Sequence, residues 1–130
     1  MIKLLVDTNQ DALSMSYIAL MKQGMRSGKH DSCLYYGGEG IACAIGHLIA
    51  EGDRRGLDED DTAILSPSIG ALVRKSRVDI GRVSSKLLRA MQWAHDENME
   101  VTAGKFREQL TEDYQRLADE FNLTLPEIVK

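Results

Sequence analysis

The stretch that decides the fold is residues 103–121, AGKFREQLTEDYQRLADEF, because its apolar side chains recur at the spacing of a helix. Steps of four, four, three and four residues separate Phe106, Leu110, Tyr114, Leu117 and Phe121. Such steps place all these side chains on one face of an α-helix. The sequence therefore predicts a long amphipathic helix that buries this face against the rest of the chain.

Three more helices are predicted upstream of this one. The first follows N-cap candidates at residues 7–9 and ends at Gly24, and the others cover residues 67–75 and about 82–98. Residues 44–50 also turn to a helical pattern. The buried stripe of the 82–98 helix is expected to consist of Val83, Leu87, Leu88, Met91 and Ala94.

A glycine-rich turn, Gly37-Gly38-Glu39-Gly40, separates two short apolar runs, residues 33–36 and 41–45. Glycine supplies the positive φ values that hairpin turns need, so a β-hairpin is predicted here. With 130 residues the chain is long enough for one core of ordinary size. We therefore predict a single α+β domain over residues 1–130, mainly helical, with about four helices packed with one small β-hairpin.

The composition is that of an ordinary globular protein, with 43% apolar and 28% charged residues. No apolar run is long enough for a signal peptide or a membrane span, so we expect a cytoplasmic protein with no membrane partner. The net charge of −4 is unevenly distributed. Residues 74–89 carry six bases against one acid, which gives +5, whereas residues 96–130 carry nine acids against four bases, which gives −5. This separation of charge can steer an anionic partner to one face.

Three short motifs resemble those of an uncharacterised family of small bacteriophage and prophage proteins. The family pattern is Cys-x-Tyr, a glycine turn, Cys-Ala-Ile-Gly-x-Leu and, much later, Gln-x-x-His-Asp. This sequence is similar at residues 33–35, 43–48 and 92–96, so the resemblance spans about residues 30–121. It departs from the family at residues 50–52, where Ala-Glu-Gly stands in place of a Pro-Asp-Glu turn. The resemblance implies a phage or mobile-element setting and names no reaction.

Cys43 and His95 are the pair from which a thiol-dependent catalytic site could be built. Cys43 stands at a predicted helix start, where a thiol pKa is lowered, and His95 could serve as its base. Asp96 is expected to be a poor orienter of His95, since adjacent side chains on a helix point about 100° apart. Cys43 also alternates with Ile41 and Ile45. The pattern therefore favours a buried structural thiol, with no catalytic residue.

A metal site is a further alternative for the same part of the chain. Cys43 and His47 are four residues apart and could share a helix face, with Cys33 and His95 as the other two ligands. Structural zinc sites usually pair their ligands at close spacing, such as C-x₂-C, whereas Cys33 and Cys43 are ten residues apart. We therefore predict no metal and no cofactor.

The basic stretch is the candidate ligand site, because guanidinium forks, hydroxyls and helix N-terminal amides bind phosphate. Aromatic side chains such as Trp93 could add stacking on a base. The overall acidity and the lack of interleaved aromatics disfavour general nucleic-acid binding, whereas a small nucleotide or an acidic patch on a protein needs far less surface. The predicted ligand-binding residues are Tyr36, Arg74, Arg77, Arg82, Lys86 and Arg89.

These observations favour a non-enzymatic accessory protein of phage or prophage origin. We expect it to counter a host defence by binding a host bacterial protein or by sequestering a small anionic nucleotide signal. One alternative is a thiol-dependent enzyme, a hydrolase or transferase, that uses Cys43 and His95. Another is a homo-oligomeric structural protein whose interface is the helix from Phe106 to Phe121.

Overall fold

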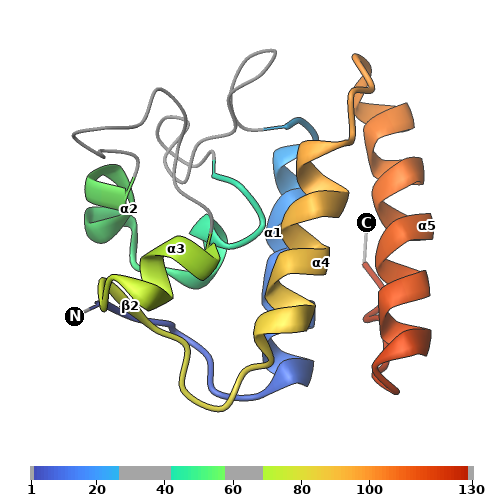
Figure 1. Cartoon of the computed structure of the whole chain (residues 1–130). Coiled ribbons are helices and arrows are strands. Elements are labelled where there is room, and N and C mark those ends of the chain that lie inside the picture. The colour runs from blue at the N-terminus through green and yellow to red at the C-terminus, as the bar shows by residue number, and fades with distance from the viewer. Residues whose placement is uncertain (1, 27–41, 58–68, 129–130) are drawn as a thin grey trace.

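The computed structural model describes residues 2–26, 42–57 and 69–128 (Figure 1). Its helices are α1 (Asn9–Gln23), the short 3-10 helix η1 (Gly46–Leu48), α2 (Glu51–Leu57), α3 (Ile69–Arg74), α4 (Ser85–Asp96) and α5 (Ala103–Glu120). Its strands are β1 (Ile2–Lys3) and β2 (Val78–Asp79). The prediction of a mainly helical α+β fold is confirmed.

The three long helices, α1, α4 and α5, form the body of the molecule. α5 packs against both α1 and α4, and α4 also contacts α3. Figure 1 shows α4 and α5 side by side, with α2 and α3 to one side of the body. The residues after α5 turn back along it, and the Gln10 side chain of α1 bonds the backbone C=O and N–H of Thr124 at 2.8 and 2.9 Å. None of the helices in the described part of the chain is both long and apolar enough to cross a membrane.

Side-chain caps fix where the three long helices begin. The hydroxyl of Thr8 accepts the Asp11 N–H at 3.1 Å at the start of α1. Ser84 and Thr102 cap α4 and α5 in the same way, each at 3.3 Å. α1 ends at Gly24, whose φ of +70° is the left-handed conformation that glycine adopts without strain. The cap predicted at residues 7–9 and the end predicted at Gly24 are therefore confirmed.

The apolar stripe of α5 lies in the core, as its spacing predicts. Phe106, Leu110 and Tyr114 are fully buried, Leu117 is nearly so, and Phe121 is half-buried against the same cluster. The stripe packs on buried residues of α1, α4 and the η1 region. Because this face is covered by the chain itself, it offers little surface for the oligomeric interface considered above.

The two strands pair differently from the predicted hairpin. β1 and β2 lie parallel, with Ile2 opposite Val78 and Lys3 opposite Asp79. The first strand of the predicted hairpin and its glycine turn lie outside the described residues. Of the second predicted strand, residues 42–45 form no strand and turn directly into η1. The prediction of a strand there is wrong for these residues.

The Gln23 side chain explains why this segment needs no strand partner. Its Oε1 accepts the Ala42 N–H at 2.9 Å, and its Nε2 donates to the Ala42 C=O at 3.0 Å. Further along, the Gly46 N–H donates to Cys43 Sγ at 3.3 Å. An amide side chain of α1 and a tight turn thus satisfy backbone groups that a strand would have paired with a neighbouring strand.

Candidate functional site

Cys43 lies in the turn before η1, and its side chain is sealed inside the protein. The residue is 1% exposed, and its thiol takes the N–H of Gly46. Burial raises the pKa of Cys43 to about 12, because its effect is larger than that of the hydrogen bonds that lower this pKa. The thiol is therefore protonated at neutral pH, and its surroundings favour a packing role over that of a nucleophile.

His95 is fully buried on α4, where Asp96 binds its ring. The Nδ1 atom lies 2.8 Å from Oδ1 of Asp96, although the two residues are neighbours on the helix. The prediction that Asp96 is a poor orienter is wrong. Nδ1 is two bonds from Cβ, so a short carboxylate at the last position of α4 reaches it despite the diverging side-chain directions. Asp96 therefore sets the orientation of the imidazole.

Gln92 links this pair to the Cys43 turn. Its Nε2 donates to Asp96 Oδ1 at 2.9 Å, and its Oε1 accepts the Ile45 N–H at 3.3 Å. The Asp96 charge contributes to raising the pKa of the Cys43 thiol, although less than burial does. These bonds join His95, through Asp96 and Gln92, to the backbone of the Cys43 turn, and none of them is a bond between the thiol and the imidazole. Both side chains are buried, whereas a substrate would have to reach them for catalysis.

His47 is half-buried and takes part in a structural contact. Its Nε2 lies 2.7 Å from Oε1 of Gln23, the same atom that holds Ala42. Burial is the main cause that lowers the pKa of His47 to about 4, and the nearby charge of Arg54 lowers it further. The ring is therefore neutral at pH 7, and its contact with Gln23 joins η1 to the end of α1.

These contacts bear on the metal alternative. Within residues 2–26, 42–57 and 69–128, no group of three or more His, Cys, Asp or Glu side chains is placed to hold a metal ion. Cys33, one of its four ligands, lies outside these ranges. Where they are described, Cys43, His47 and His95 bind protein groups instead.

The basic stretch is divided over several elements. Arg74 ends α3, and Arg77 lies half-buried in the turn between α3 and β2. Tyr36 lies outside the described residues. The structure therefore does not place the six predicted ligand-binding residues on one helix face, and the largest group that shares an element is on α4.

Arg82 contacts Asp7 in the N-terminal part of the chain. Its Nε and Nη2 lie 2.8 and 2.7 Å from Oδ2 of Asp7, and its backbone N–H donates to Oδ1 at 3.1 Å. The hydrogen bonds from Arg82 lower the pKa of Asp7. Such a charge-assisted fork joins the loop before α1 to the loop before α4, so Arg82 serves the fold.

The outer face of α4 carries the rest of the predicted site. Lys86 and Arg89 are exposed and three residues apart, and Trp93 follows four residues later. This spacing puts the three side chains on one face of the helix. Trp93 is 61% exposed, which is unusual for so large an apolar side chain in a protein of this size. Cationic and aromatic groups therefore lie together on this face.

A hollow of about 310 Å³, the Trp93 groove, lies beside this face between α4 and α5. Its floor is made of small and apolar side chains. Its two charged residues face one another, with Nη1 of Arg116 3.6 Å from Oδ1 of Asp113, and Asp113 also accepts from Gln109 at 3.1 Å. The groove is lined by Ala90, Trp93, Ala94, Asp113, Arg116 and Leu117.

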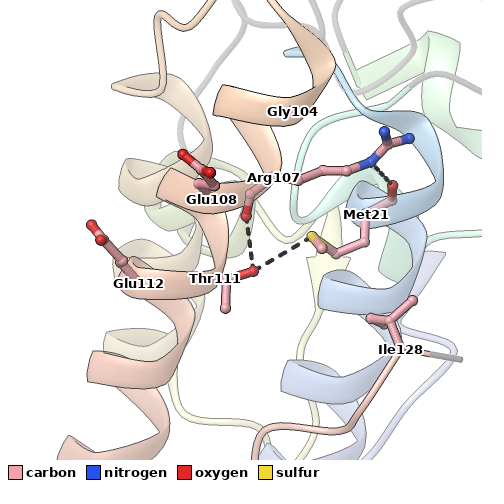
Figure 2. A pocket seen from close by; sticks show the side chains of 7 residues that line it. All are labelled: Met21, Gly104, Arg107, Glu108, Thr111, Glu112 and Ile128. Atoms are coloured by element: carbon pink, nitrogen blue, oxygen red, sulfur yellow. Dashed lines mark hydrogen bonds between the residues drawn. The ribbon is translucent and has the colours of Figure 1, made fainter. Parts of the chain in front are cut away.

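A second hollow, the α1–α5 pocket, lies where α1, α5 and the C-terminal residues meet (Figure 2). Its volume is about 860 Å³. In Figure 2 the Arg107 side chain reaches across from α5 to the end of α1, while Glu108 and Glu112 point to the outer side of α5. The pocket is lined by Met21, Gly104, Arg107, Glu108, Thr111, Glu112 and Ile128.

The two hollows differ in whether the sequence indicates them. Trp93 falls outside the buried stripe of α4 that contains Leu87, Met91 and Ala94, and a large apolar residue on a polar helix face is a signal for a contact surface. The α1–α5 pocket has no such signal, because its walls come from three distant parts of the chain.

Comparison with known proteins identifies no relative of this chain. No family model, no curated protein and no solved structure matches it. The resemblance to bacteriophage and prophage proteins therefore rests on the motif residues alone and stays a prediction.

Proposed function

We propose that this chain is a non-enzymatic binding protein that recognises an acidic segment of a protein partner through the outer face of α4. The observation that carries the proposal is the exposed indole of Trp93, which shares a helix face with Lys86 and Arg89 and lies beside an apolar groove. Tryptophan and arginine are the side chains that most often dominate protein interfaces.

The shape of the Trp93 groove favours a protein segment over a nucleotide. Its volume of about 310 Å³ suits one or two apolar side chains. The charged residues that line it, Arg116 and Asp113, lie in contact with one another. Few polar groups in the groove are therefore available to hydrogen-bond the edge of a nucleotide base. An amphipathic helix with acidic flanks would place apolar residues in the groove and carboxylates near Lys86 and Arg89.

The biological setting is part of the same proposal. The motif residues support a bacteriophage or prophage origin, and a small protein that covers an acidic surface could counter a host defence in the bacterial cytoplasm. Sequestration of an anionic nucleotide signal is the competing form of this function. Its phosphates would bind the same cations and its base would stack on Trp93.

The enzymatic alternative faces a physical obstacle in the described residues. Catalysis by Cys43 needs a thiolate that a substrate can reach, whereas burial holds this thiol protonated and 1% exposed. His95, its partner in that mechanism, is buried as well. The geometry therefore supports binding better than thiol chemistry.

The fluorescence of Trp93, the chain's only tryptophan, provides the test. We would titrate the protein with a synthetic helical peptide of leucine and glutamate, with the same peptide carrying lysine for glutamate, and with an adenine dinucleotide. The acidic peptide should shift the emission to shorter wavelength by covering the indole, and binding should weaken as salt is added.

Charge reversal locates the interaction. Lys86→Glu with Arg89→Glu should abolish the response to the acidic peptide, whereas the matched reversal of two exposed bases outside the predicted site, Lys22→Glu with Lys105→Glu, should leave it unchanged. Equal responses of both charge-reversed proteins would contradict the proposed site. A response to the dinucleotide alone would replace the protein partner with a nucleotide.

A further inference from the structure

The α1–α5 pocket is separate from the Trp93 groove and opens beside another part of α5. Met21 comes from α1, Ile128 from the residues after α5, and the other described lining residues from positions 104–112 of α5 (Figure 2). Among the residues that the structure describes, none lines both hollows. A ligand in this pocket would therefore contact α1 and the C-terminal residues at once.

Two polar groups on the pocket floor, the Nε–H of Arg107 and the hydroxyl of Thr111, are engaged within the protein. Arg107 Nε donates to the backbone C=O of Met21 at 2.7 Å, next to the end of α1. The Thr111 hydroxyl donates to the C=O of Arg107 at 2.8 Å and lies 2.9 Å from the hydroxyl of Tyr17. The floor therefore presents mainly the thioether of Met21 and the aliphatic side chain of Ile128. Contact with these groups favours an apolar body in the ligand.

The described lining residues carry a net negative charge, because Glu108 and Glu112 outnumber Arg107. Glu108 and Glu112 are exposed and one helical turn apart. The positive charge of Arg107 lies against the carbonyl end of α1, where it complements the helix dipole. A ligand entering from solvent thus meets two carboxylates, which favour a cationic group over an anionic one.

From these features we propose that the α1–α5 pocket binds a small organic cation with an apolar body, such as an arylalkylamine. The pocket volume of about 860 Å³ is in the range of sites that hold small ligands. The apolar body lies between Met21 and Ile128, and the ammonium group lies at the solvent-exposed rim on α5. There it is attracted by the charges of Glu108 and Glu112, whose side chains point to the outer side of the helix (Figure 2).

Gly104 provides a clean way to block the pocket. It lines the pocket, and a Cβ added there meets nothing within 4 Å, so a larger side chain can grow into the open space without a clash. Gly52 of α2 is equally open and lies outside the pocket. The variants Gly104→Phe and Gly52→Phe therefore make a matched pair, of which one fills the site.

The test uses two probes of similar apolar body and opposite charge, phenylbutylamine and phenylbutyrate. Binding is followed by the shifts of the Met21 and Ile128 methyl resonances at neutral pH. We expect saturable binding of the amine, about three- to tenfold tighter than the carboxylate. The double variant Glu108→Gln with Glu112→Gln should remove this preference. Gly104→Phe should abolish binding, and Gly52→Phe should leave it unchanged.

Three results would overturn the proposal. The first is the lack of saturable binding by either probe, and the second is equal affinity for the amine and the carboxylate. The third is undiminished binding by the folded Gly104→Phe protein, which would place the probe elsewhere on the surface.

Discussion

Replacing Ser16 by alanine should destabilise this protein more than replacing Tyr114 by phenylalanine, although the two hydroxyls bond each other. The Ser16 hydroxyl donates to the C=O of Ala44 at 2.9 Å, so the Tyr114 hydroxyl at 2.8 Å donates to Ser16 Oγ. Burial raises the pKa of Tyr114, which keeps the phenol protonated and able to donate. The three groups form a directed chain inside the core, where water is excluded.

The magnitudes follow from which groups each substitution leaves without a partner. Tyr114→Phe leaves the Ser16 to Ala44 bond intact and should cost about 0.5–1.5 kcal/mol. Ser16→Ala removes the partner of both the Tyr114 hydroxyl and the Ala44 C=O, and should cost about 2–4 kcal/mol. In the double variant the phenol is gone, so its cost should fall about 1–2 kcal/mol below the sum of the single costs.

Urea unfolding of the four proteins, followed by far-UV circular dichroism, measures these free energies. Ser85→Ala, at an exposed position of α4, is the control and should change stability by less than about 0.5 kcal/mol. Strictly additive costs would refute the directed chain, and so would a larger loss for Tyr114→Phe than for Ser16→Ala.

Three further predictions concern other parts of the fold. Gly81→Ala should lower the free energy of unfolding in urea by about 1–3 kcal/mol, because φ at this residue is +57° and the added Cβ would lie 2.6 Å from Oδ1 of Asp7. The control Gly52→Ala, in a helix with open space around it, should be neutral or stabilising, and equal effects of the two substitutions would contradict this reasoning. Cys43 should react with an aromatic disulfide reagent near neutral pH only as fast as the chain opens, and labelling at the rate of the urea-unfolded chain would speak against its burial. Between pH 6.5 and about 4, His47 becomes protonated in the unfolded chain but not in the folded chain, so the free energy of unfolding should fall as the pH drops through this interval. His47→Gln should flatten the dependence of the free energy of unfolding on pH in this interval, and an unchanged slope would argue against the lowered pKa.

Local patterns were enough to predict the helical part of the fold. The stripe from Phe106 to Phe121 and the limits of α1 at Thr8 and Gly24 depend on residues within a few positions of one another. The strand pairing depends on distant residues, because the partner of Ile2 is Val78. A strand assigned from a glycine turn could not anticipate that the Gln23 side chain would take the backbone groups of Ala42.

The candidate site shows the same division between local and distant information. The α4 face of Lys86, Arg89 and Trp93 could be located by helical spacing alone. The pairing of Arg82 with Asp7 could not, because it joins positions 75 residues apart. The contact between His95 and Asp96 is local, yet helix geometry predicts that Asp96 is a poor orienter of His95. The prediction is wrong because it considers only the directions of the two Cβ atoms and leaves out how far the side chains extend.

The bonds that anchor α1 impose an order on biosynthesis. Gln10, Ser16, Tyr17 and Met21 have hydrogen-bond partners that lie 114, 98, 94 and 86 residues further along the chain. A ribosome making this protein releases the first helix long before α5 leaves the exit tunnel. The part of the apolar face of α1 that α5 covers therefore stays exposed to chaperones and proteases until α5 has been synthesised. Messages or nascent chains that stop before α5 would yield a product whose first helix lacks the hydrogen-bond partners that α5 and the residues after it supply.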